Sequence, residues 1–444
     1  MNFKNNMKII LMALFIFVLI ACGNNGDSED THDPNQENAG TETVPSNGNG
    51  DPIADGDALS VTIWDSFQEP GLRQIMDEFT NETGIHVNLS IVTWNEYWTM
   101  LQAAAQGGSL PDVFWMHSAE FQRYADNQML LDLTELIADS DRVDLDRFYS
   151  DIVELYNYDG RQYAVPKDID TIALWYNRSM FDEAGIPYPD ETWTWDTLIE
   201  VAESLTEDDG SQYGFAWGPE NDQEGYHNLI YSLGGYVINE DRTLSGWDHP
   251  QTIYAMTYVE RLLPFMPSLE MLAENSTHVL FESSQIAMST FGSWMVPAFA
   301  NNDYLLENAG VTVLPMSADG NRVSIYNGLG WAAAADGPNT EEAWRLIEFL
   351  GSEDMQRKQA ELGITMSAFE GTSDTWINSV PEFNLQAYLD MTDNMVIRPF
   401  SRNATAWQRV AQTRLQEVWQ GVSVTEILPE IAEEMNRLLE EERQ

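Results

Sequence analysis

The sequence predicts an α/β protein built from two domains. Segments typical of strands and helices alternate from Leu59 onward: "LSVTIWDSF" and "IHVNLSIV" alternate in hydropathy, and a helical segment follows each of them. A buried strand, "PDVFWM", comes next. This order is typical of a sheet covered by helices. About 390 residues follow residue 57, which is enough for two domains with substantial cores.

Three helices can be expected from local patterns. In "EPGLRQIMDEFTNETG" the apolar residues fall at helical spacing, with Pro70 near the expected start and Gly84 just past the end. The segment "NEYWTMLQAAAQGG" also reads as a helix. Near the C-terminus, Ser423 and Glu426 have the spacing of a capping box before a helix that closes the chain.

Residues 1–21 have the features of a secretion signal. Lys4 and Lys8 precede an apolar run, residues 9–21, that is shorter than the roughly 20 residues needed to cross a bilayer. Cys22, the only cysteine, ends the stretch "LIAC", which resembles the lipobox of bacterial lipoproteins. The resemblance implies cleavage before Cys22, its lipidation, and attachment to the extracellular face of the cell membrane. An ordinary signal peptide followed by a chance cysteine is the alternative.

Residues 22–57 are expected to form a disordered tether behind this anchor. The stretch has almost no large apolar residues, so burial cannot offset the entropy cost of ordering it. As a flexible coil it would span roughly 30 Å, which would hold a globular body clear of the membrane.

The composition is strongly acidic. The chain has 72 Asp and Glu residues against 21 Lys and Arg, a formal net charge of −51, which argues against nucleic acid as a partner. Only Lys167 and Lys358 would remain as lysines after cleavage. An acid excess with scarce lysine indicates a salty or alkaline habitat. A site for a cationic ligand is the alternative, but it would explain a local cluster better than acids spread along the whole chain.

Signatures of catalysis are missing from the sequence. It has no P-loop, no G-x-S-x-G and no H-E-x-x-H motif, and its six histidines never share helical ligand spacing. We therefore expect no enzyme activity, no cofactor and no metal. The 15 tryptophans stand out instead, because an indole at a strand end can serve as a stacking platform for a ligand.

Residues 171–206, "TIALWYNRSMFDEAGIPYPDETWTWDTLIEVAESLT", resemble the signature of extracellular solute-binding proteins of family 1, the group that includes the maltose-binding protein. Two further stretches resemble the same family in the same order, "LQAAAQGGSLPDVFWMHSAEFQRYADNQMLLDLT" and "GVTVLPMSADGNRVSIYNGLGWAAAADGPNTEEAWRLIEFLGSEDMQ". With the lipobox included, the resemblance covers nearly the whole chain.

The resemblance implies a periplasmic-binding-protein-like fold of type II, with two α/β domains joined by crossing strands and a ligand cleft between them. We expect the crossings near Pro166 and Pro315. The N-terminal domain would be residues 59–165 plus 316–350, and the C-terminal domain 166–315 plus 351–444. The implied function is that of a monomeric binding lipoprotein of an ABC importer. It would capture a mono- or oligosaccharide by hinge closure and deliver it to the membrane permease.

The resemblance also implies ligand-binding residues. Trp294 matches a Gly-x-Trp loop whose indole stacks on a sugar ring, and Trp407 matches a second stacking position; a core role is the alternative for each. Positions at the end of the "PDVFWMHS" segment match donors to sugar hydroxyls: Trp115, His117 and Ser118.

Acidic residues after the first crossing match a carboxylate that accepts from hydroxyls. They are Asp168 and Asp170, of which we expect one to face the cleft while Lys167 pairs with the other. The remaining candidates are Trp64, Asp65, Ser66, Trp94, Trp217, Glu224, Asn327, Gly328 and Arg402. Arg402 would suit an acidic sugar, although pairing on the surface suits it better.

Two other functions stay open. The same scaffold could carry a non-sugar solute such as a polyamine, which clustered cleft carboxylates would favour. A surface carbohydrate-active enzyme would instead need two opposed carboxylates roughly 5–10 Å apart across a sugar site.

Overall fold

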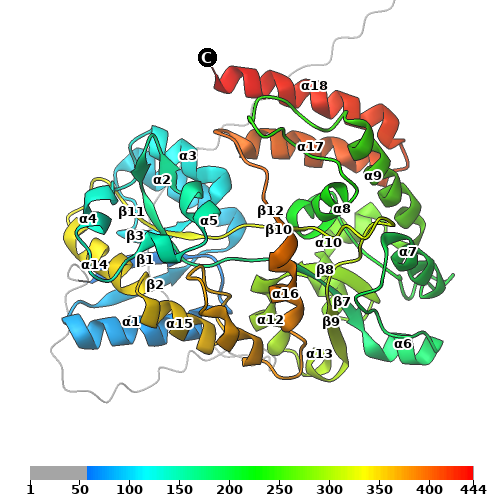
Figure 1. Ribbon diagram of the computed structural model, residues 1–444, viewed down its shortest axis with the longest axis horizontal. Helices are drawn as coiled ribbons and strands as arrows, with labels where there is room; N and C mark the ends of the chain where they lie inside the picture. Colours follow the sequence, from blue (N-terminus) through cyan, green and yellow to red (C-terminus); the bar gives the residue numbers. More distant parts are fainter. Residues whose placement is uncertain (1–57, 444) are drawn as a thin grey trace, which may run out of the picture. The chain divides into compact units, whose positions relative to one another are not determined.

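Two β-sheets organise the chain (Figure 1). A computed structural model describes residues 58–443, so the predicted signal peptide, Cys22 and the tether lie outside the described residues. The larger sheet has the strand order β2-β1-β3-β11-β6 and the smaller one β8-β7-β9. We call the elements around the larger sheet the first lobe and those around the smaller sheet the second lobe.

The first lobe contains the predicted alternation of strands and helices. β1 runs parallel to β2 and β3, whereas β11 is antiparallel to both β3 and β6. Its elements up to the first crossing are β1 (Leu59–Ile63), α1 (Glu69–Thr83), β2 (Val87–Ile91), α2 (Trp94–Gly107), β3 (Val113–Met116), α3 (Ser118–Asp126), α4 (Thr134–Ala138), α5 (Ser150–Leu155), β4 (Asn157–Tyr158), β5 (Arg161–Gln162) and β6 (Ala164–Pro166).

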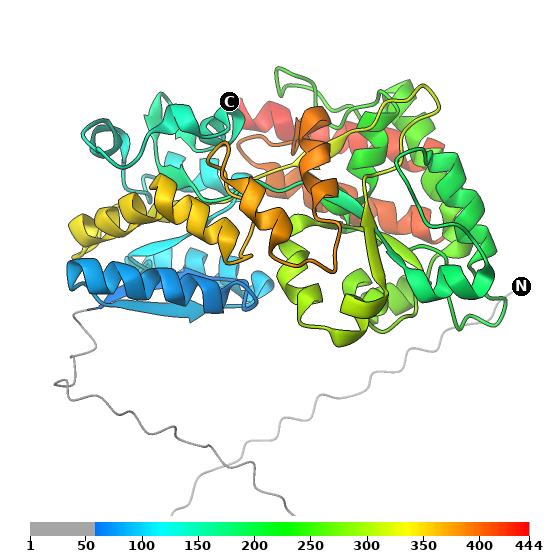
Figure 2. The ribbon, with the colours of Figure 1, turned by 60° about the horizontal axis from the view of Figure 1, so that its bottom comes forward.

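Helix α1 forms as its pattern predicts. Its apolar positions Leu72, Ile75, Met76 and Phe79 are all buried. Gly84 ends it at φ 74°, in the left-handed region that glycine enters without steric cost. Figure 2 shows α1 beside α14 (Thr340–Leu350), which comes much later in the chain and packs against the same sheet.

The second lobe begins once the chain has left β6. Strands β7 and β8 pair antiparallel, and so do β7 and β9. Its elements are β7 (Ile172–Asn177), α6 (Arg178–Ala184), α7 (Trp195–Ser204), a π-helical turn η2 (Asp222–Tyr226), α8 (His227–Ser232), α9 (Pro250–Leu262), α10 (Leu269–Glu274), α11 (Thr277–Glu282), β8 (Met288–Gly292), η4 (Ser293–Met295), α12 (Val296–Ala300), α13 (Asp303–Asn308) and β9 (Ala309–Thr312).

Short segments connect the two lobes. The first runs from the end of β6 at Pro166 to the start of β7 at Ile172. The chain returns through β10 (Ser324–Tyr326), which pairs with β12 (Met395–Ile397), and enters the larger sheet as β11 (Gly330–Ala333). Met316 still donates its backbone N–H to Trp193 O in the second lobe. The crossing back to the first lobe therefore comes after Tyr326, later in the chain than the position near Pro315 expected from the sequence.

The last part of the chain touches both lobes. α15 (Glu353–Glu361) packs against α1, while α18 (Val424–Glu442) packs against α9 and α17 (Ala404–Trp419). α16 (Gln386–Asp390) lies against β7 and β9. Ser423 caps the final helix as predicted, because its Oγ accepts a hydrogen bond from the N–H of Thr425. In a full capping box the donor would be the N–H of Glu426.

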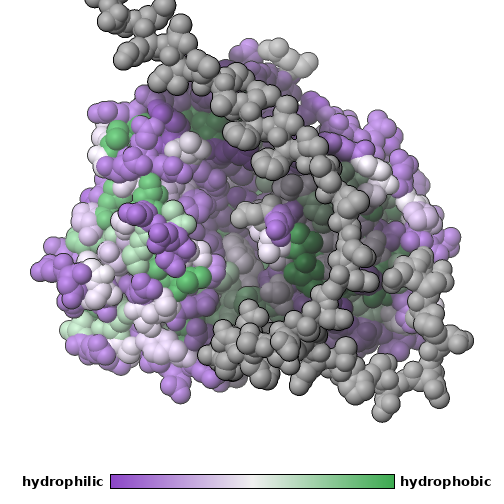
Figure 3. Space-filling view, turned by 180° about the vertical axis from the view of Figure 1, so that it is seen from behind, coloured by the Kyte–Doolittle hydropathy of each residue, from purple (hydrophilic) through white to green (hydrophobic). Residues whose placement is uncertain are grey.

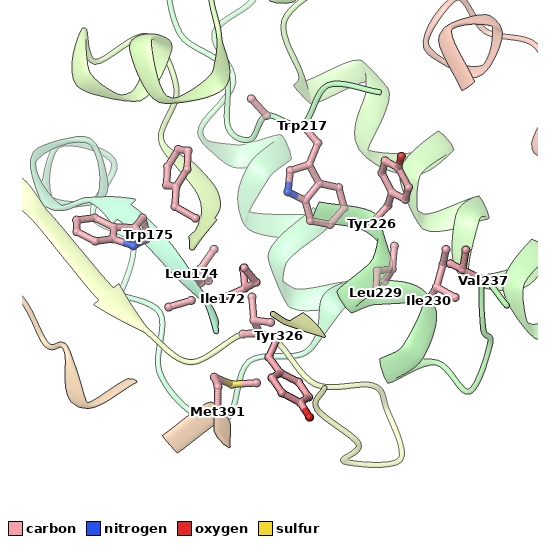
Figure 4. Packing of buried hydrophobic residues seen from close by; sticks show 14 of the residues in the cluster. Ile172, Leu174, Trp175, Trp217, Tyr226, Leu229, Ile230, Val237, Tyr326 and Met391 are labelled. Atoms are coloured by element: carbon pink, nitrogen blue, oxygen red, sulfur yellow. The ribbon is translucent and has the colours of Figure 1, made fainter. Parts of the chain in front are cut away.

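The second lobe is filled by large aromatic side chains. Figure 4 shows Trp175, Trp217 and Tyr226 among buried aliphatic residues. The indole N–H groups of the two tryptophans are satisfied, since Trp175 donates to Tyr388 Oη at 2.7 Å and Trp217 to Thr290 Oγ1 at 2.7 Å. Because both indoles are buried and their N–H groups are hydrogen-bonded, the two tryptophans are core residues.

Acidic residues dominate the charge of the chain. Both lysines of the described part are ion-paired, Lys167 with Asp168 and Lys358 with Glu78. On the face seen in Figure 3, hydrophilic residues cover much of the visible surface. Within residues 58–443 no helix combines the length and the apolar character that a membrane crossing requires.

We expect sodium chloride to stabilise the protein. A formal net charge of −51 repels itself, and the screening length falls from roughly 10 Å at 0.1 M salt to about 3 Å at 1 M. The Tm should therefore rise between these two concentrations, as followed by circular dichroism. Sodium chloride is the suitable probe because strongly excluded salts stabilise almost any protein. A flat or falling Tm would contradict the interpretation of the charge as an adaptation to salt.

Candidate functional site

A cavity of about 590 Å³ is lined by residues of both lobes. Its volume lies within the range of small-molecule sites. The first-lobe side and the segments next to it contribute Trp64, Asp65, Ser66, Phe67, Gln68, Trp94, His117, Asp168 and Leu329. The second-lobe side contributes Glu220, Asn221, Asp222, Gln223, Glu224, His278, Glu282, Trp294, Met295 and Ala298, and Arg398 comes from the segment after β12. We call this cavity the cleft.

Exposed aromatic rings form the first-lobe wall of the cleft. Phe67 is 49% exposed and Trp94 is 44% exposed, although residues of this size are normally buried. Trp64 follows β1 and meets Trp94 edge to face, with ring centroids 5.0 Å apart. Because Trp64 also packs on buried Trp115, the wall is held in place from behind. It offers rigid apolar faces to a ligand.

A buried glycine places the aromatic residue of the opposite wall. Trp294 lies in the turn η4 directly after β8 and is half-buried. A Cβ on Gly292 would come within 2.1 Å of its ring, so the indole can fold over the backbone only because residue 292 is glycine. The Gly-x-Trp pattern of the sequence therefore has a steric reason.

Glu224 contacts the same glycine. Its Oε1 accepts from the N–H of Gly292 at 3.2 Å and its Oε2 from Asn221 Nδ2 at 3.3 Å. Burial raises the pKa of Glu224 to about 7, although these two hydrogen bonds favour the ionised form. A carboxyl group poised in this way can accept hydrogen bonds from a ligand on its remaining lone pairs.

The loop that carries Glu224 is irregular. It forms the π-helical turn η2, in which Gly225 has the non-helical angles φ −116° and ψ −114°. Turns of this kind are frequent at functional sites because they redirect side chains. Here Gly225 packs against the ring of Trp217, which leaves Asp222, Gln223 and Glu224 to line the cleft.

A network of polar side chains connects the lobes at the floor of the cleft. Arg398 donates from Nη2 to both oxygens of Asp222, at 3.0 and 3.1 Å, and its Nη1 lies 3.2 Å from His117 Nε2. Burial lowers the pKa of His117 to about 3, and the charge of Arg398 acts in the same direction, so this ring is neutral at pH 7. Asn327 Nδ2 lies 3.0 Å from the same His117 nitrogen.

The two aspartates after the first crossing have different surroundings. Asp168 lines the cleft, but its Oδ2 accepts from Lys167 Nζ at 2.6 Å and its Oδ1 from the N–H of Leu329 at 2.7 Å. Asp170 lies behind the lining, where its Oδ1 accepts from Gln223 Nε2 and from the N–H of Asn327. Burial and the nearby Asp168 raise the pKa of Asp170 well above its usual value.

Within residues 58–443, no group of three or more His, Cys, Asp or Glu side chains is arranged to hold a metal ion.

The cleft combines flat apolar faces with hydrogen-bonding side chains from two lobes. That combination suits reversible binding of a small polar ligand.

Comparison with known proteins agrees with this geometry. Residues 65–357 match the family described as bacterial extracellular solute-binding protein. The chain belongs to this family. A structure of an ABC substrate-binding protein from Listeria monocytogenes in complex with cycloalternan superposes with a TM-score of 0.80 at 22% identity, covering 86% of this chain and 99% of that one. This likeness confirms the predicted two-domain binding-protein fold.

Curated relatives match this solute-binding protein over most of their length. The multiple sugar-binding protein of Streptococcus mutans is 22% identical over 321 residues, which covers 68% of this chain and 73% of the relative. The galactooligosaccharide-binding protein of Bacillus subtilis is 24% identical over 321 residues, covering 68% and 70%.

The structure brings eight of the residues predicted as ligand contacts to the cleft of this solute-binding protein. They come from segments far apart in the sequence and are Trp64, Asp65, Ser66, Trp94, His117, Asp168, Glu224 and Trp294. Asp168 is both the aspartate that faces the cleft and the one that pairs with Lys167, whereas these roles were expected to be divided between Asp168 and Asp170.

The other predicted contacts do not line the cleft. Trp115, Trp217 and Trp407 are fully packed in the core, and Trp407 donates its indole N–H to Ser401 Oγ at 2.9 Å. Ser118 is buried at the start of α3. Arg402 pairs with Asp126 on the surface, as the alternative expectation had it.

Asn327 and Gly328 lie behind the cleft rather than in its lining. The side chain of Asn327 contacts His117, and its backbone N–H donates to Asp170, which also accepts from Gln223 of the lining. A Cβ on Gly328 would lie 2.2 Å from the carbonyl oxygen of Asp168, so this glycine allows two crossing segments to approach closely. Both residues support the site through the backbone at the crossing.

Several lining residues were missed at the sequence level. Four of them belong to the same loop as Glu224, namely Glu220, Asn221, Asp222 and Gln223. The sequence pointed to this loop but not to the direction in which its side chains point. No sequence motif around Arg398 indicated a site, because the role of this residue depends on its ion pair with Asp222. His278 and Glu282 lie on the short helix α11, and nothing in their spacing pointed to a site.

Proposed function

We propose that this extracellular solute-binding protein captures a mono- or oligosaccharide in the cleft and delivers it to the membrane subunits of an ABC importer. The observation that carries the proposal is the pair of aromatic walls, Trp64 and Trp94 facing from one lobe and Trp294 from the other. Sugar rings stack on indoles through their apolar faces, while their hydroxyls need polar partners. Gln68, Asn221 and Glu224 supply such partners. The sugar ligands named for relatives support the same proposal.

Binding would draw the two lobes together. Residues from both lobes line one cavity, so a ligand that contacts both walls stabilises the closed arrangement by its differential affinity for it. The segments around β6 and β10 would act as the hinge, dividing the chain into two α/β domains. The importer would then recognise the closed, monomeric form.

A calorimetric screen with a panel of neutral mono-, di- and trisaccharides tests this function. We expect at least one sugar to bind at a single site without chemical change, and chromatography of the mixture checks that no product forms. New reducing ends would instead favour a carbohydrate-active enzyme. Absence of binding by every sugar would contradict the proposal.

We further propose that lipidated Cys22 anchors the protein outside the cell, with residues 22–57 as the tether. The lipobox and the hydrophilic composition that follows it support this anchor. Cys22→Ala is expected to release the protein into the medium or to stall its processing, which cell fractionation and immunoblotting would show. The anchor is refuted if the variant stays as tightly membrane-associated as the wild type after washing without detergent.

A further inference from the structure

The lining of the cleft is rich in acidic side chains. Acidic residues make up nearly one in three of the cleft lining, against about one in six of the whole chain. Two of the six are neutralised, Asp168 by Lys167 and Asp222 by Arg398. Within the part of the chain that the structure describes, no Lys or Arg side chain forms an ion pair with the remaining four, Asp65, Glu220, Glu224 and Glu282.

Three of these carboxylates are partly buried, Asp65, Glu224 and Glu282, whereas Glu220 is exposed. Burial raises the pKa of the three partly buried groups, and it is the largest contribution in each case. Among the described residues, Arg398 is the only Lys or Arg that lines the cleft, and it is already paired with Asp222. The lining histidines, His117 and His278, have pKa values lowered by burial. The cleft lining therefore has an excess of acidic over basic side chains, and a bound cation would favour the ionised form of these carboxyl groups.

The same cleft also presents flat apolar faces. Trp64, Trp94 and Trp294 can hold a ring, and an ammonium group beside an indole gains a further electrostatic attraction. Neutral polar side chains, among them Ser66 and Gln68, match hydroxyl groups. A ligand that satisfies all of these features carries a ring, hydroxyls and a positive charge together.

We propose that the preferred ligand is a carbohydrate with a free, protonated amine, an amino sugar rather than a neutral one. Its ammonium group would be received by Glu224, with Glu220 and Glu282 on the same side of the cleft, and its ring would lie against the tryptophans. This inference rests on the proposed function and specifies the class of sugar. A linear polyamine would meet the carboxylates but would leave the indole faces and the neutral polar groups without a matching partner.

Titration calorimetry with matched ligands tests the proposal at neutral pH. The first set is glucose, glucosamine and N-acetylglucosamine, and the second is cellobiose, chitobiose with free amines and N,N′-diacetylchitobiose, with spermidine as a separate arm. The free amine is expected to bind about 10- to 100-fold more tightly than its neutral counterpart, as for hydrogen bonds to charged groups. Acetylation, which removes the charge, should abolish the advantage.

A pair of variants separates a local contact from the general negative field of the protein. Glu224→Gln keeps the size and hydrogen-bonding capacity of the side chain and should remove most of the preference for the amine. Glu307→Gln removes the same charge from exposed α13, outside the cleft, and should leave the preference unchanged.

Each outcome has a distinct meaning. Equal or tighter binding of the neutral sugars would overturn the inference and leave the proposed function standing. The same holds if Glu307→Gln lowers the preference as much as Glu224→Gln. Binding of spermidine with no binding of any carbohydrate would overturn the sugar-binding function itself, and so would a complete absence of binding.

Discussion

Replacing Trp294 by alanine is expected to weaken ligand binding by about 30- to 1000-fold while leaving the fold intact. Truncating an aromatic residue at a desolvated contact typically costs about 2–4 kcal/mol of binding free energy. Trp294 is half-buried in a turn, and the backbone beneath it is fixed by the strand pairing of Gly292 with Ile172. The variant should therefore lose the stacking face without losing the site's framework.

Two measurements on this variant distinguish a ligand contact from a core residue. Calorimetry with the best ligand reports the affinity, and urea unfolding of the ligand-free protein reports the stability. The matched control is Trp407→Ala, which removes a fully buried indole and should cost about 3–5 kcal/mol of stability while the affinity of the folded protein is kept. If Trp294→Ala behaves like Trp407→Ala, Trp294 is a core residue and the assigned site fails.

Replacing Arg398 by methionine is expected to lower the free energy of unfolding by about 3–5 kcal/mol at pH 7. Arg398 and Asp222 have side chains only 12% and 7% exposed, and removing one partner leaves an uncompensated buried charge. The exposed residue Arg437 offers the control, since Arg437→Met breaks surface ion pairs that are worth about 0–1 kcal/mol.

The loss in Arg398→Met should depend on pH in a defined direction. Burial is the largest single effect and would raise the pKa of Asp222, but the charge of Arg398, the charge of His227 and the hydrogen bonds from Arg398 and the N–H of Gln223 together hold the pKa below its ordinary value. Asp222 therefore contributes stability above its unfolded-state pKa, and that contribution is lost as the pH falls through the folded-state pKa. In Arg398→Met the loss should be largest near neutral pH and should shrink in acid, where Asp222 can take up a proton.

A second substitution checks the cause of that loss. Asp222→Asn in the Arg398→Met background removes the unpaired charge and should recover part of the stability, as measured by urea unfolding at pH 7. If the double variant is no more stable than Arg398→Met, the stranded carboxylate is not the cause.

The features that could be predicted from the sequence are those with local causes. Helix α1 follows from the spacing of Leu72, Ile75, Met76 and Phe79, together with Gly84 at its end, and the cap of α18 follows from Ser423. Family resemblance added the arrangement of two lobes. Both kinds of information sit in contiguous stretches of the chain.

The roles of individual tryptophans could not be predicted in the same way. Trp294 and Trp407 had similar motif support, but one faces the cleft and the other is buried among α17 and its neighbours. Burial depends on contacts between distant segments, such as the hydrogen bond from Trp419 Nε1 to Trp217 O. Arg398 was missed for the same reason, because its partner Asp222 lies far away in the sequence.

The central claim is that a carbohydrate binds between the aromatic walls of the cleft, and a crystal structure of the complex tests it most directly. Crystals should be grown with the tightest ligand found by calorimetry. We predict a sugar ring stacked on Trp294, with the first-lobe wall of Trp64 and Trp94 closed over its other side. Density for the ligand elsewhere would contradict the account, for example in the separate apolar cavity of about 560 Å³ beside Tyr231 and Phe400.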